Sequence, residues 1–325
     1  MLPPVHHSYS RLVSPTSALK RLSIRGATRG VGPHDIPVIS IRDPNALTQV
    51  IGWLKFTSGS GRVLFRGQST LYPSLYPSGL RDSQSRTMTK YSYSMKRFVS
   101  AAAGADCRCR PGGFGYAHSE RCEEQVRKSD SPRGLVARTY RAAVEPLLQH
   151  YGLRTRWLDL VDNIWIALWF GCQTHIQHGR HASHLLRSPD REPDGKAYIV
   201  IVDAGPMEET GIPGYWIGAN ARLVDLRYAV PSIYLRPHAQ HGWLIAPRAL
   251  AAADPSPGDL APMVSAALEI NLGDALNWMG SGQMLSTHVL FPPATHDGGY
   301  RRILDYAPLP GAMLGDFAIY GPSSN

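Results

Sequence analysis

Two stretches of the sequence decide the fold: Val63-Leu64-Phe65-Arg66-Gly67-Gln68 and Leu148-Gln149-His150-Tyr151-Gly152-Leu153-Arg154-Thr155-Arg156-Trp157-Leu158-Asp159. The first is an apolar run that delivers an arginine and an amide to a glycine turn. The second ends a helix in a cluster of His, Thr, Arg and Asp. Strand ends followed by turns are where ligand sites are commonly built. The two stretches therefore predict one site for an anionic, nucleotide-like ligand.

The sequence before the first stretch predicts a strand and then a helix. Residues 37–41 alternate like a short strand, and Asp43-Pro44 is a good helix start, with Asp as cap and Pro in the first turn. Apolar residues then follow at helical spacing: Leu47, Val50, Ile51 and Leu54. Residues 63–65 are expected to form a buried strand that places Arg66 at its end.

The sequence after residue 134 alternates predicted helices and strands. We expect a helix over 136–151, bent or restarted at Pro146, and a second helix over 163–174, capped by Asp162 and apolar nearly all round. Residues 196–203 are typical of a central strand, and further strands are expected at 232–235 and 243–246. This order predicts an α+β fold, a single domain around one mixed sheet with flanking helices.

The chain is expected to divide into a tail, a domain of residues 35–310 and a C-terminal tail of residues 311–325. Residues 1–34 contain no acidic residue and five basic ones: Arg11, Lys20, Arg21, Arg25 and Arg29. Such a composition is typical of a transit peptide and also of a disordered basic tail, and the prolines near the start favour the tail. Two loop-rich insertions are expected inside the domain, near 82–134 and 175–195.

Composition places the chain among globular proteins and excludes several classes. Of the 325 residues, 43% are hydrophobic, yet no run approaches the roughly 20 apolar residues of a membrane span. Four cysteines do not make a secreted disulfide scaffold, so a reducing, cytoplasmic compartment is expected. The net charge of +9 favours polyanions such as nucleic acid or nucleotides, although the same excess also serves plain solubility.

Two groups of metal-ligating residue types occur, and neither predicts a metal site. Cys107, Cys109, His118 and Cys122 do not follow a usual zinc-finger spacing, so free thiols in a loop are the simpler interpretation, with zinc left open. His175, His178, His181 and His184 repeat every three residues, which on a helix lets only neighbouring pairs share an ion. A solvated linker is expected there.

Three constellations carry candidate chemistry. Arg66 at a strand end can fork onto a phosphate or carboxylate and Gly67 can let a ligand approach the backbone, although Arg66 paired with Asp159 would be purely structural. The second constellation lies in the loop between two apolar helices: Gln149, His150, Thr155, Arg156 and Asp159. In the third, which follows Arg236, Gln240 can hydrogen-bond a ribose hydroxyl or simply bond the backbone as a buried amide.

These residues give the sequence its family resemblance. It resembles the FRG domain family through Phe65-Arg66-Gly67-Gln68, Gln149-His150-Tyr151-Gly152 with Thr155-Arg156-Trp157-Leu158-Asp159, Ala167-Leu168-Trp169-Phe170, Arg236…Gln240-His241-Gly242 and Leu290-Phe291-Pro292. The resemblance spans roughly residues 37–307. Arg154, Leu160 and Ile164 stand where the family usually has Pro, Trp and Pro, and none of these departures removes a polar group.

The order of motifs is in turn similar to that of the ADP-ribosyltransferase superfamily. The resemblance implies that Arg66 contacts the pyrophosphate or ribose of NAD, that Thr155 supports the nicotinamide ribose and that Gln240 takes the third-motif position. The same resemblance extends the expected nucleotide-binding set to Gly67, Gln68, Arg156 and Arg236. It also implies the expected catalytic set of His150, Asp159 and Gln240. A glutamine cannot supply the charge that a glutamate gives at the third position, so transfer requires Asp159 or another carboxylate.

Two functions remain open from the sequence. One is an enzyme that uses NAD as substrate for ADP-ribosyl transfer or for glycohydrolysis, with the acceptor macromolecule unknown. The other is a non-catalytic module that binds a nucleotide or nucleic acid through the same basic cleft. We expect the strand of Arg66, the loop 149–159 and the segment 236–242 to converge on that cleft.

Overall fold

The computed structural model describes residues 25–31, 34–58, 62–81, 141–178, 181–248, 258–306 and 319–320. Its centre is a ten-stranded mixed sheet, so the predicted α+β architecture around a mixed sheet is confirmed. Across the sheet the strands run in the order β1 (Arg25–Val31), β2 (His34–Ile41), β12 (Val264–Asn271), β7 (Lys196–Asp203), β3 (Val63–Gln68), β4 (Leu158–Val161), β11 (Gly242–Pro247), β10 (Ala221–Asp225), β9 (Tyr215–Gly218) and β8 (Met207–Glu209). Strands β2 and β12 pair in parallel, whereas the other neighbours in this sheet pair antiparallel.

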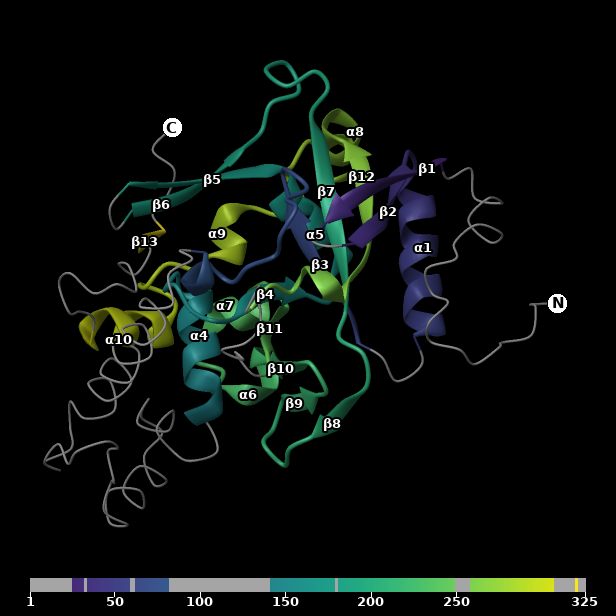
Figure 1. Cartoon of the computed structure of the whole chain (residues 1–325). Coiled ribbons are helices and arrows are strands. Elements are labelled where there is room, and N and C mark those ends of the chain that lie inside the picture. The colour runs from purple at the N-terminus through teal and green to yellow at the C-terminus, as the bar shows by residue number, and fades with distance from the viewer. Residues whose placement is uncertain are drawn as a thin grey trace, which may run out of the picture.

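Helices flank this sheet along its length (Figure 1). Helix α1 lies beside the β1–β2 edge, and α4 lies beside the half that contains β4 and β11. The helices are α1 (Pro44–Thr57), α4 (Val144–His150), α5 (Ile164–Gly171), α6 (Leu226–Ala229), α7 (Leu235–Ala239), α8 (Leu272–Trp278), α9 (Thr287–Leu290) and α10 (Gly298–Tyr306), with 3-10 turns η3 (Ser78–Leu80), η5 (Arg141–Ala143) and η6 (Ala261–Met263).

Alternation along the strands divides the buried side chains between the two faces of the sheet. On β3, Phe65 joins a core with α1, α5 and α8, whereas Leu64 joins a core on the opposite face. A third core, which includes Leu244, packs α4 and α10 against β10 and β11. Leu158 and Leu160 of β4 belong to the core on the opposite face, while on the other face Val161 belongs to the first core and Leu244, which pairs with Asp159, belongs to the third. Asp159 therefore sits at the border between two apolar regions.

Several elements match their sequence predictions closely. Strand β7 spans 196–203 as expected, and β2 and β3 contain the predicted strands. Asp43 caps α1, because its carboxylate accepts a hydrogen bond from Asn45 N at 2.6 Å.

The second apolar helix begins one residue later than predicted. Asn163, not Asp162, caps α5 and accepts from Trp165 N at 2.9 Å, which frees the Asp162 side chain for other partners. The helix expected over 136–151 is described from η5 onward and becomes α-helical at Val144, just before Pro146, while residues 136–140 lie outside the described residues.

Two predicted segments are wrong in type. The stretch expected as a loop at 175–195 contains a hairpin of β5 (Gln173–His178) and β6 (His181–Leu186), in which His175 pairs with His184 and His178 with His181. This hairpin forms a small sheet with β13 (Ile319–Tyr320). The strand expected at 232–235 is a turn that leads into α7, since Pro231 and Pro237 flank it and disfavour a strand ladder.

The expected boundary of the N-terminal tail also differs from the structure. Residues 25–31 form β1, which pairs with β2 from Arg25 opposite Ser40 to Val31 opposite His34. The pairing with β2 satisfies the backbone hydrogen-bonding groups of residues 25–31. The amino-acid composition of a segment gives no information on such pairing. Residues 1–24, 32 and 33 of the expected tail, the insertion at 82–134 and the expected C-terminal tail other than β13 lie outside the described residues, as do the cysteines considered for zinc.

Candidate functional site

The centre of the candidate site is the Asp159 carboxylate on β4. His150 Nδ1 lies 3.0 Å from Asp159 Oδ1, and Gln149 Nε2 donates to Asp159 Oδ2 at 2.9 Å. Both partners come from the last turn of α4, where consecutive residues reach the same strand because the helix ends against it. The carboxylate is thus fixed at both oxygens while its side chain stays 37% exposed. We refer to Gln149, His150 and Asp159 as the Asp159 cluster.

Thr155 locks the loop that carries this cluster. Gln149 Oε1 accepts from Thr155 Oγ1 at 2.8 Å and from Thr155 N at 3.1 Å, and Thr155 Oγ1 accepts from Trp157 N at 3.1 Å. The Thr155 side chain is fully buried. Thr155 therefore holds Gln149 in place.

The turn η3 docks onto the same loop from the other side. Ser78 Oγ donates to Gln149 Oε1 at 3.1 Å, and Gly79 N donates to Thr155 O at 2.8 Å. This brings the segment after the Phe-Arg-Gly motif against the loop that carries the Asp159 cluster.

Arg66 reaches β4 where the ladder between β3 and β4 stops. The two strands share one ladder pair, Phe65 with Val161, and next to it Arg66 Nη1 donates to Asp159 O at 2.7 Å. The guanidinium thus bonds a main-chain carbonyl at the point where the ladder ends. Among the described residues, Arg66 Nε gains an acceptor when the Gln68 amide is turned to donate to Thr70 O, which places the Gln68 oxygen 3.3 Å from Arg66 Nε.

The two charges of the site influence each other. Burial works most strongly against ionisation of Asp159, yet the hydrogen bond and charge of His150, the charge of Arg66 and the Gln149 hydrogen bond together hold the pKa of Asp159 below its ordinary value. Burial also lowers the pKa of Arg66, which Arg81 lowers further and Asp159 opposes. At neutral pH the site therefore presents an ionised carboxylate next to a guanidinium.

His150 is enclosed on both sides of its ring. Nδ1 is engaged with Asp159, and Nε2 is buried with no hydrogen-bond partner among the described residues. A Cβ at Gly242 would lie 2.5 Å from Nε2, so the glycine at the start of β11 makes room for the ring. His150 was predicted to be catalytic, but this geometry suits a positioning residue that acts through Asp159.

Gly67 has a different task from the one expected. A Cβ at residue 67 would lie 1.8 Å from the carbonyl oxygen of Ala167 and 2.7 Å from Gly171 N, both in α5. The missing side chain lets α5 pack directly on β3, so the space expected for a ligand is filled by the helix. Gln68, next along the strand, is buried.

The other predicted residues have partners away from the cluster. Arg156 forms a two-pronged ion pair with Glu145, Nε to Oε1 at 3.0 Å and Nη2 to Oε2 at 2.6 Å. Gln240 is buried and donates to Leu290 O at 2.7 Å, as its backbone-bonding alternative predicts. Arg236 is fully buried, with its guanidinium carbon 4.0 Å from the Tyr300 ring centroid and 4.7 Å from that of Tyr151.

The three predicted segments nevertheless lie side by side. Arg66 touches β4, and the segment 236–242 reaches His150 through Gly242, whose β11 pairs with β4. A shared ligand cleft stays a prediction, because Arg236 and Gln240 turn to other partners.

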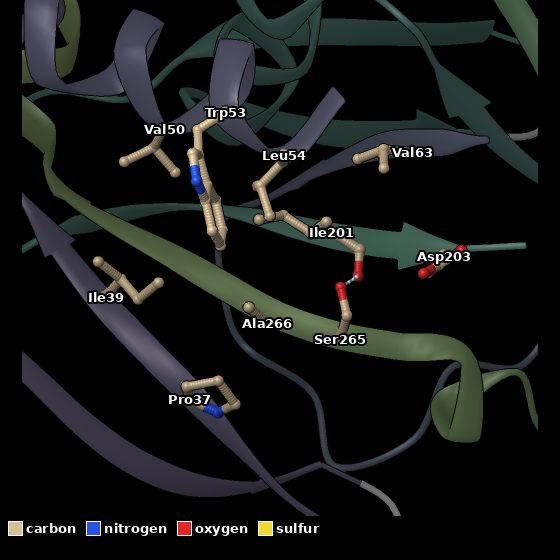
Figure 2. A pocket seen from close by; sticks show the side chains of 10 residues that line it. All are labelled: Pro37, Ile39, Val50, Trp53, Leu54, Val63, Ile201, Asp203, Ser265 and Ala266. Atoms are coloured by element: carbon tan, nitrogen blue, oxygen red, sulfur yellow. Dashed lines mark hydrogen bonds between the residues drawn. The ribbon is translucent and has the colours of Figure 1, made fainter. Parts of the chain in front are cut away.

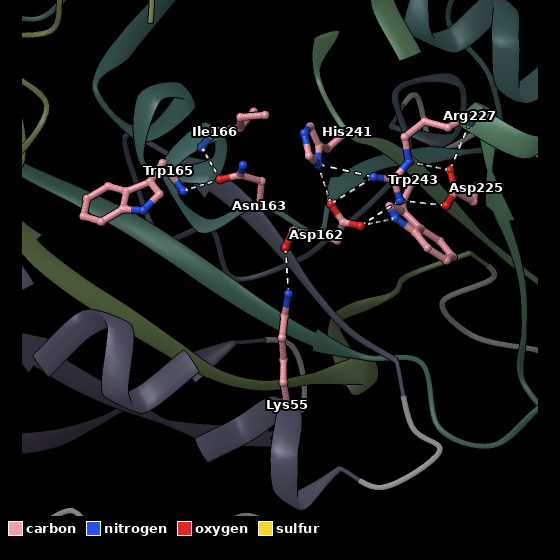
Figure 3. A network of polar contacts seen from close by, with 9 residues as sticks. All are labelled: Lys55, Asp162, Asn163, Trp165, Ile166, Asp225, Arg227, His241 and Trp243. Atoms are coloured by element: carbon pink, nitrogen blue, oxygen red, sulfur yellow. Dashed lines mark hydrogen bonds and ion pairs between the residues drawn. The ribbon is translucent and has the colours of Figure 1, made fainter. Parts of the chain in front are cut away.

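A second cluster of polar side chains lies just beyond the C-terminal end of β4 (Figure 3). The sequence did not predict which residues form it. The Asp162 carboxylate receives Arg227 Nη2 at 2.7 Å and Trp243 Nε1 at 3.2 Å, and its other oxygen lies 3.0 Å from His241 Nδ1. Arg227 also holds the buried Asp225 through Nε at 2.9 Å and Nη2 at 2.7 Å. We refer to these five residues as the Asp162 network. The sequence contained one indication of this network. Asp162 and Asn163 are both good helix caps, and only one of them can cap α5, which leaves the other for different partners.

Hydrogen bonds and charge shift both ends of this network. Burial has the largest single effect on the pKa of Asp162 and raises it. The partners of the carboxylate, Arg227 first, together outweigh burial and lower this pKa below its ordinary value. The Asp225 hydrogen bond is the main cause of the raised pKa of Arg227. His241 adopts φ of 51°, a left-handed conformation unusual for a residue with a side chain.

A separate pocket lies between α1 and the sheet (Figure 2). It holds about 490 Å³ of empty space, its solvent-open part included. Val50, Trp53 and Leu54 line it from the helix, while Ile201 and Ala266 line it from the strands. Its lining is mostly apolar and contains none of the predicted site residues.

Two negative findings hold for the part of the chain that the structure describes. No group of three or more His, Cys, Asp or Glu side chains there is arranged to hold a metal ion. Across the described ranges, no helix has the length and apolar character needed to cross a bilayer.

Comparison with known proteins gives one match. Residues 61–180 match the model of the FRG domain family, whereas no curated protein and no solved structure matches the chain. The matched range includes the Phe-Arg-Gly strand, the Asp159 cluster, α5 and Gly67. These are the elements that the geometry shows to be joined, and the chain therefore contains an FRG domain.

Proposed function

We propose that this FRG domain binds NAD beside Asp159 and cleaves its nicotinamide–ribose bond, passing ADP-ribose to water or to an acceptor. The observation that carries the proposal is the Asp159 carboxylate, ionised, partly exposed and fixed by His150 and Gln149 beside Arg66. A fixed charge placed where the opposite charge develops in the transition state is usually the largest single contribution to an enzyme's rate enhancement.

The chemistry follows from the charges. As the bond between ribose C1′ and the pyridinium nitrogen breaks, its electron pair leaves with nicotinamide, which becomes neutral. The ribose is left with oxocarbenium character, which a carboxylate stabilises. Water or an acceptor hydroxyl then forms the new bond to C1′ and releases a proton to solvent. Asp159 is the stabilising carboxylate in this proposal, which relieves Gln240 of that role.

Arg66 supports the binding half of the proposal. A guanidinium held by a main-chain carbonyl keeps its positive charge available, and planar forked donors suit a phosphate. The net charge of +9 favours approach of the same anionic ligand.

The test is incubation of the full chain with NAD, followed by mass spectrometry of free nicotinamide, of ADP-ribose and of the protein itself. Asp159→Asn keeps the shape of the side chain and removes its charge, and we expect nicotinamide release to fall by about a hundredfold or more. Asp190→Asn, an exposed aspartate in a turn, is the matched control and should release nicotinamide like the wild type.

The pH dependence provides a second readout. Because the pKa of Asp159 is lowered, the carboxylate is already ionised well below neutrality, so release should hold constant from pH 7 down to about 5. Release should then fall as the pH drops through the lowered pKa. Wild-type protein that binds NAD without releasing nicotinamide would instead support the non-catalytic nucleotide-binding module.

A further inference from the structure

Two arginines near the site are each anchored by a main-chain carbonyl. Arg66 donates through Nη1 to Asp159 O at 2.7 Å, and Arg81 donates through Nε to Tyr76 O at 3.3 Å. Each guanidinium is oriented by a main-chain carbonyl, which has no net charge to cancel. By contrast, Arg156, Arg187 and Arg227 are each paired with a carboxylate.

Arg81 lies beside the site because of how η3 docks. The turn ends at Arg81, and its first two residues bond the second motif, Ser78 Oγ to Gln149 and Gly79 N to Thr155 O. This docking brings Arg81 close enough to Arg66 to lower the pKa of that guanidinium, after burial, which is the main cause. Among the described residues, two guanidinium groups therefore share one region with the Asp159 carboxylate.

Like charges at close range repel, and an anion between them relieves that repulsion. A diphosphate has two phosphoryl groups a few ångströms apart, each of which accepts forked hydrogen bonds. Within the described ranges, neither Nη atom of Arg81 has a hydrogen-bond acceptor on the protein. The side chain is exposed, so it can turn toward a ligand without breaking a buried contact.

We propose that Arg66 and Arg81 form a clamp for the diphosphate group of a nucleotide, with Arg81 holding the phosphate farther from Asp159. This inference rests on the proposed function for its ligand class, and it adds a binding residue that the motifs do not contain. In this arrangement Arg66 orients the phosphate nearest the reacting ribose, and the turn η3 sets the spacing between the two arginines.

The test is calorimetric titration of the full chain with ADP and with AMP, neither of which carries nicotinamide. Arg81→Gln should weaken ADP binding by about tenfold or more, because one charged fork to phosphate is lost. It should change AMP binding by about threefold or less, because a monophosphate engages Arg66 alone. The control is Arg191→Gln, at an exposed arginine in a turn far along the sequence, and it should leave both affinities unchanged.

Arg81→Lys separates charge from geometry. It keeps the positive charge and loses the planar fork, so its ADP affinity should fall between those of wild type and Arg81→Gln. Wild-type ADP affinity in Arg81→Gln, or equal weakening of ADP and AMP, would overturn the clamp.

The clamp and the proposed function fail in different ways. Normal nicotinamide release together with Arg81-independent ADP binding would reject the clamp and leave the enzyme proposal standing. Arg81-dependent ADP binding without any nicotinamide release would retain the clamp and reject the enzyme. Absence of ADP binding by the wild type would overturn the clamp outright.

Discussion

The Asp159 cluster and the Asp162 network lie at the two ends of strand β4, and each joins an aspartate to a histidine beside an arginine, but the two arginines bind different groups. Both carboxylates lie 3.0 Å from a histidine Nδ1, and both have a lowered pKa. At Asp162, Arg227 binds the carboxylate itself and a second buried carboxylate as well. At Asp159, Arg66 binds only the main-chain carbonyl. The charge of Arg227 is thus paired with two carboxylates, whereas the group that holds Arg66 carries no net charge.

The largest effect is expected from Gly67→Ala, which tests what the Phe-Arg-Gly glycine contributes to the Asp159 end. The new methyl group would overlap the Ala167 carbonyl, so α5 must move away from β3. We expect a loss of about 3 kcal/mol or more in the free energy of unfolding. Chemical denaturation measures it, with Gly52→Ala, in open space on α1, as a control that keeps or gains stability. A stable Gly67→Ala protein with weakened NAD binding would restore the ligand role of this glycine.

Arg227→Ala tests whether the Asp162 network is scaffold. Its removal leaves Asp225 buried and uncompensated, with Asp162 half paired, so the unfolding free energy should fall by roughly 3 kcal/mol. NAD affinity per folded molecule should stay unchanged. The same titration and denaturation are compared with Arg222→Ala, whose arginine donates to Pro247 O and lies over the Trp157 ring without pairing with a buried carboxylate in the described residues, so this change should cost less. Lost NAD affinity in folded Arg227→Ala would mean that both ends of β4 serve the ligand.

Arg66→Ala tests the opposite end with the opposite expectation. NAD affinity should drop by about a hundredfold, equal to roughly 2.7 kcal/mol, while the unfolding free energy falls by only about 1–2 kcal/mol for one charged bond to a carbonyl. Thermal melting and NAD titration of the same variant separate the two quantities. A large fall in melting temperature with unchanged affinity would make Arg66 a scaffold residue like Arg227.

His241→Gly should produce the smallest change. The substitution removes the hydrogen bond to Asp162 but relieves the left-handed backbone at φ of 51°, so the two effects offset to within about 1 kcal/mol. His150→Ala, at the buried counterpart, should cost about 2 kcal/mol because it empties an enclosed space and releases Asp159. Equal costs for the two variants would remove the contrast between the exposed and buried histidines.

Short sequence patterns correctly predicted those elements whose local preference matches their surroundings in the fold. The Asp43-Pro44 helix start, the β-branched run 196–203 and the apolar strand before Arg66 were read correctly because side-chain chemistry alone specifies them. The cap of α5 was misassigned because Asp162 and Asn163 are both good caps, and only the presence of Arg227 and Trp243 in space decides between them. The hairpin β5–β6 was missed since its polar residues do not alternate with apolar ones.

The candidate site was predicted in part, for a similar reason. The motifs identified Arg66, His150 and Asp159 as neighbours, and they are neighbours. They did not reveal that Arg156 pairs with Glu145, one helical turn before the motif, or that Gly67 faces α5. Those roles depend on which atoms approach from elsewhere in the chain, and a motif contains no information on that.

The interleaved strand order has a consequence for how the chain acquires its structure during synthesis. Strand β2 gains its second neighbour only with β12, where Val38 lies beside Ala267, and β3, besides one ladder pair with β4, pairs along its whole length with β7. Pairings between such distant residues form slowly, because long loops must close first. Until the ribosome has released β12, the edges of β2 and β7 stay open to other chains. The family-matched residues 61–180 also lack β7 and β11, the partners of β3 and β4, so expressed alone they should depend on chaperones and aggregate.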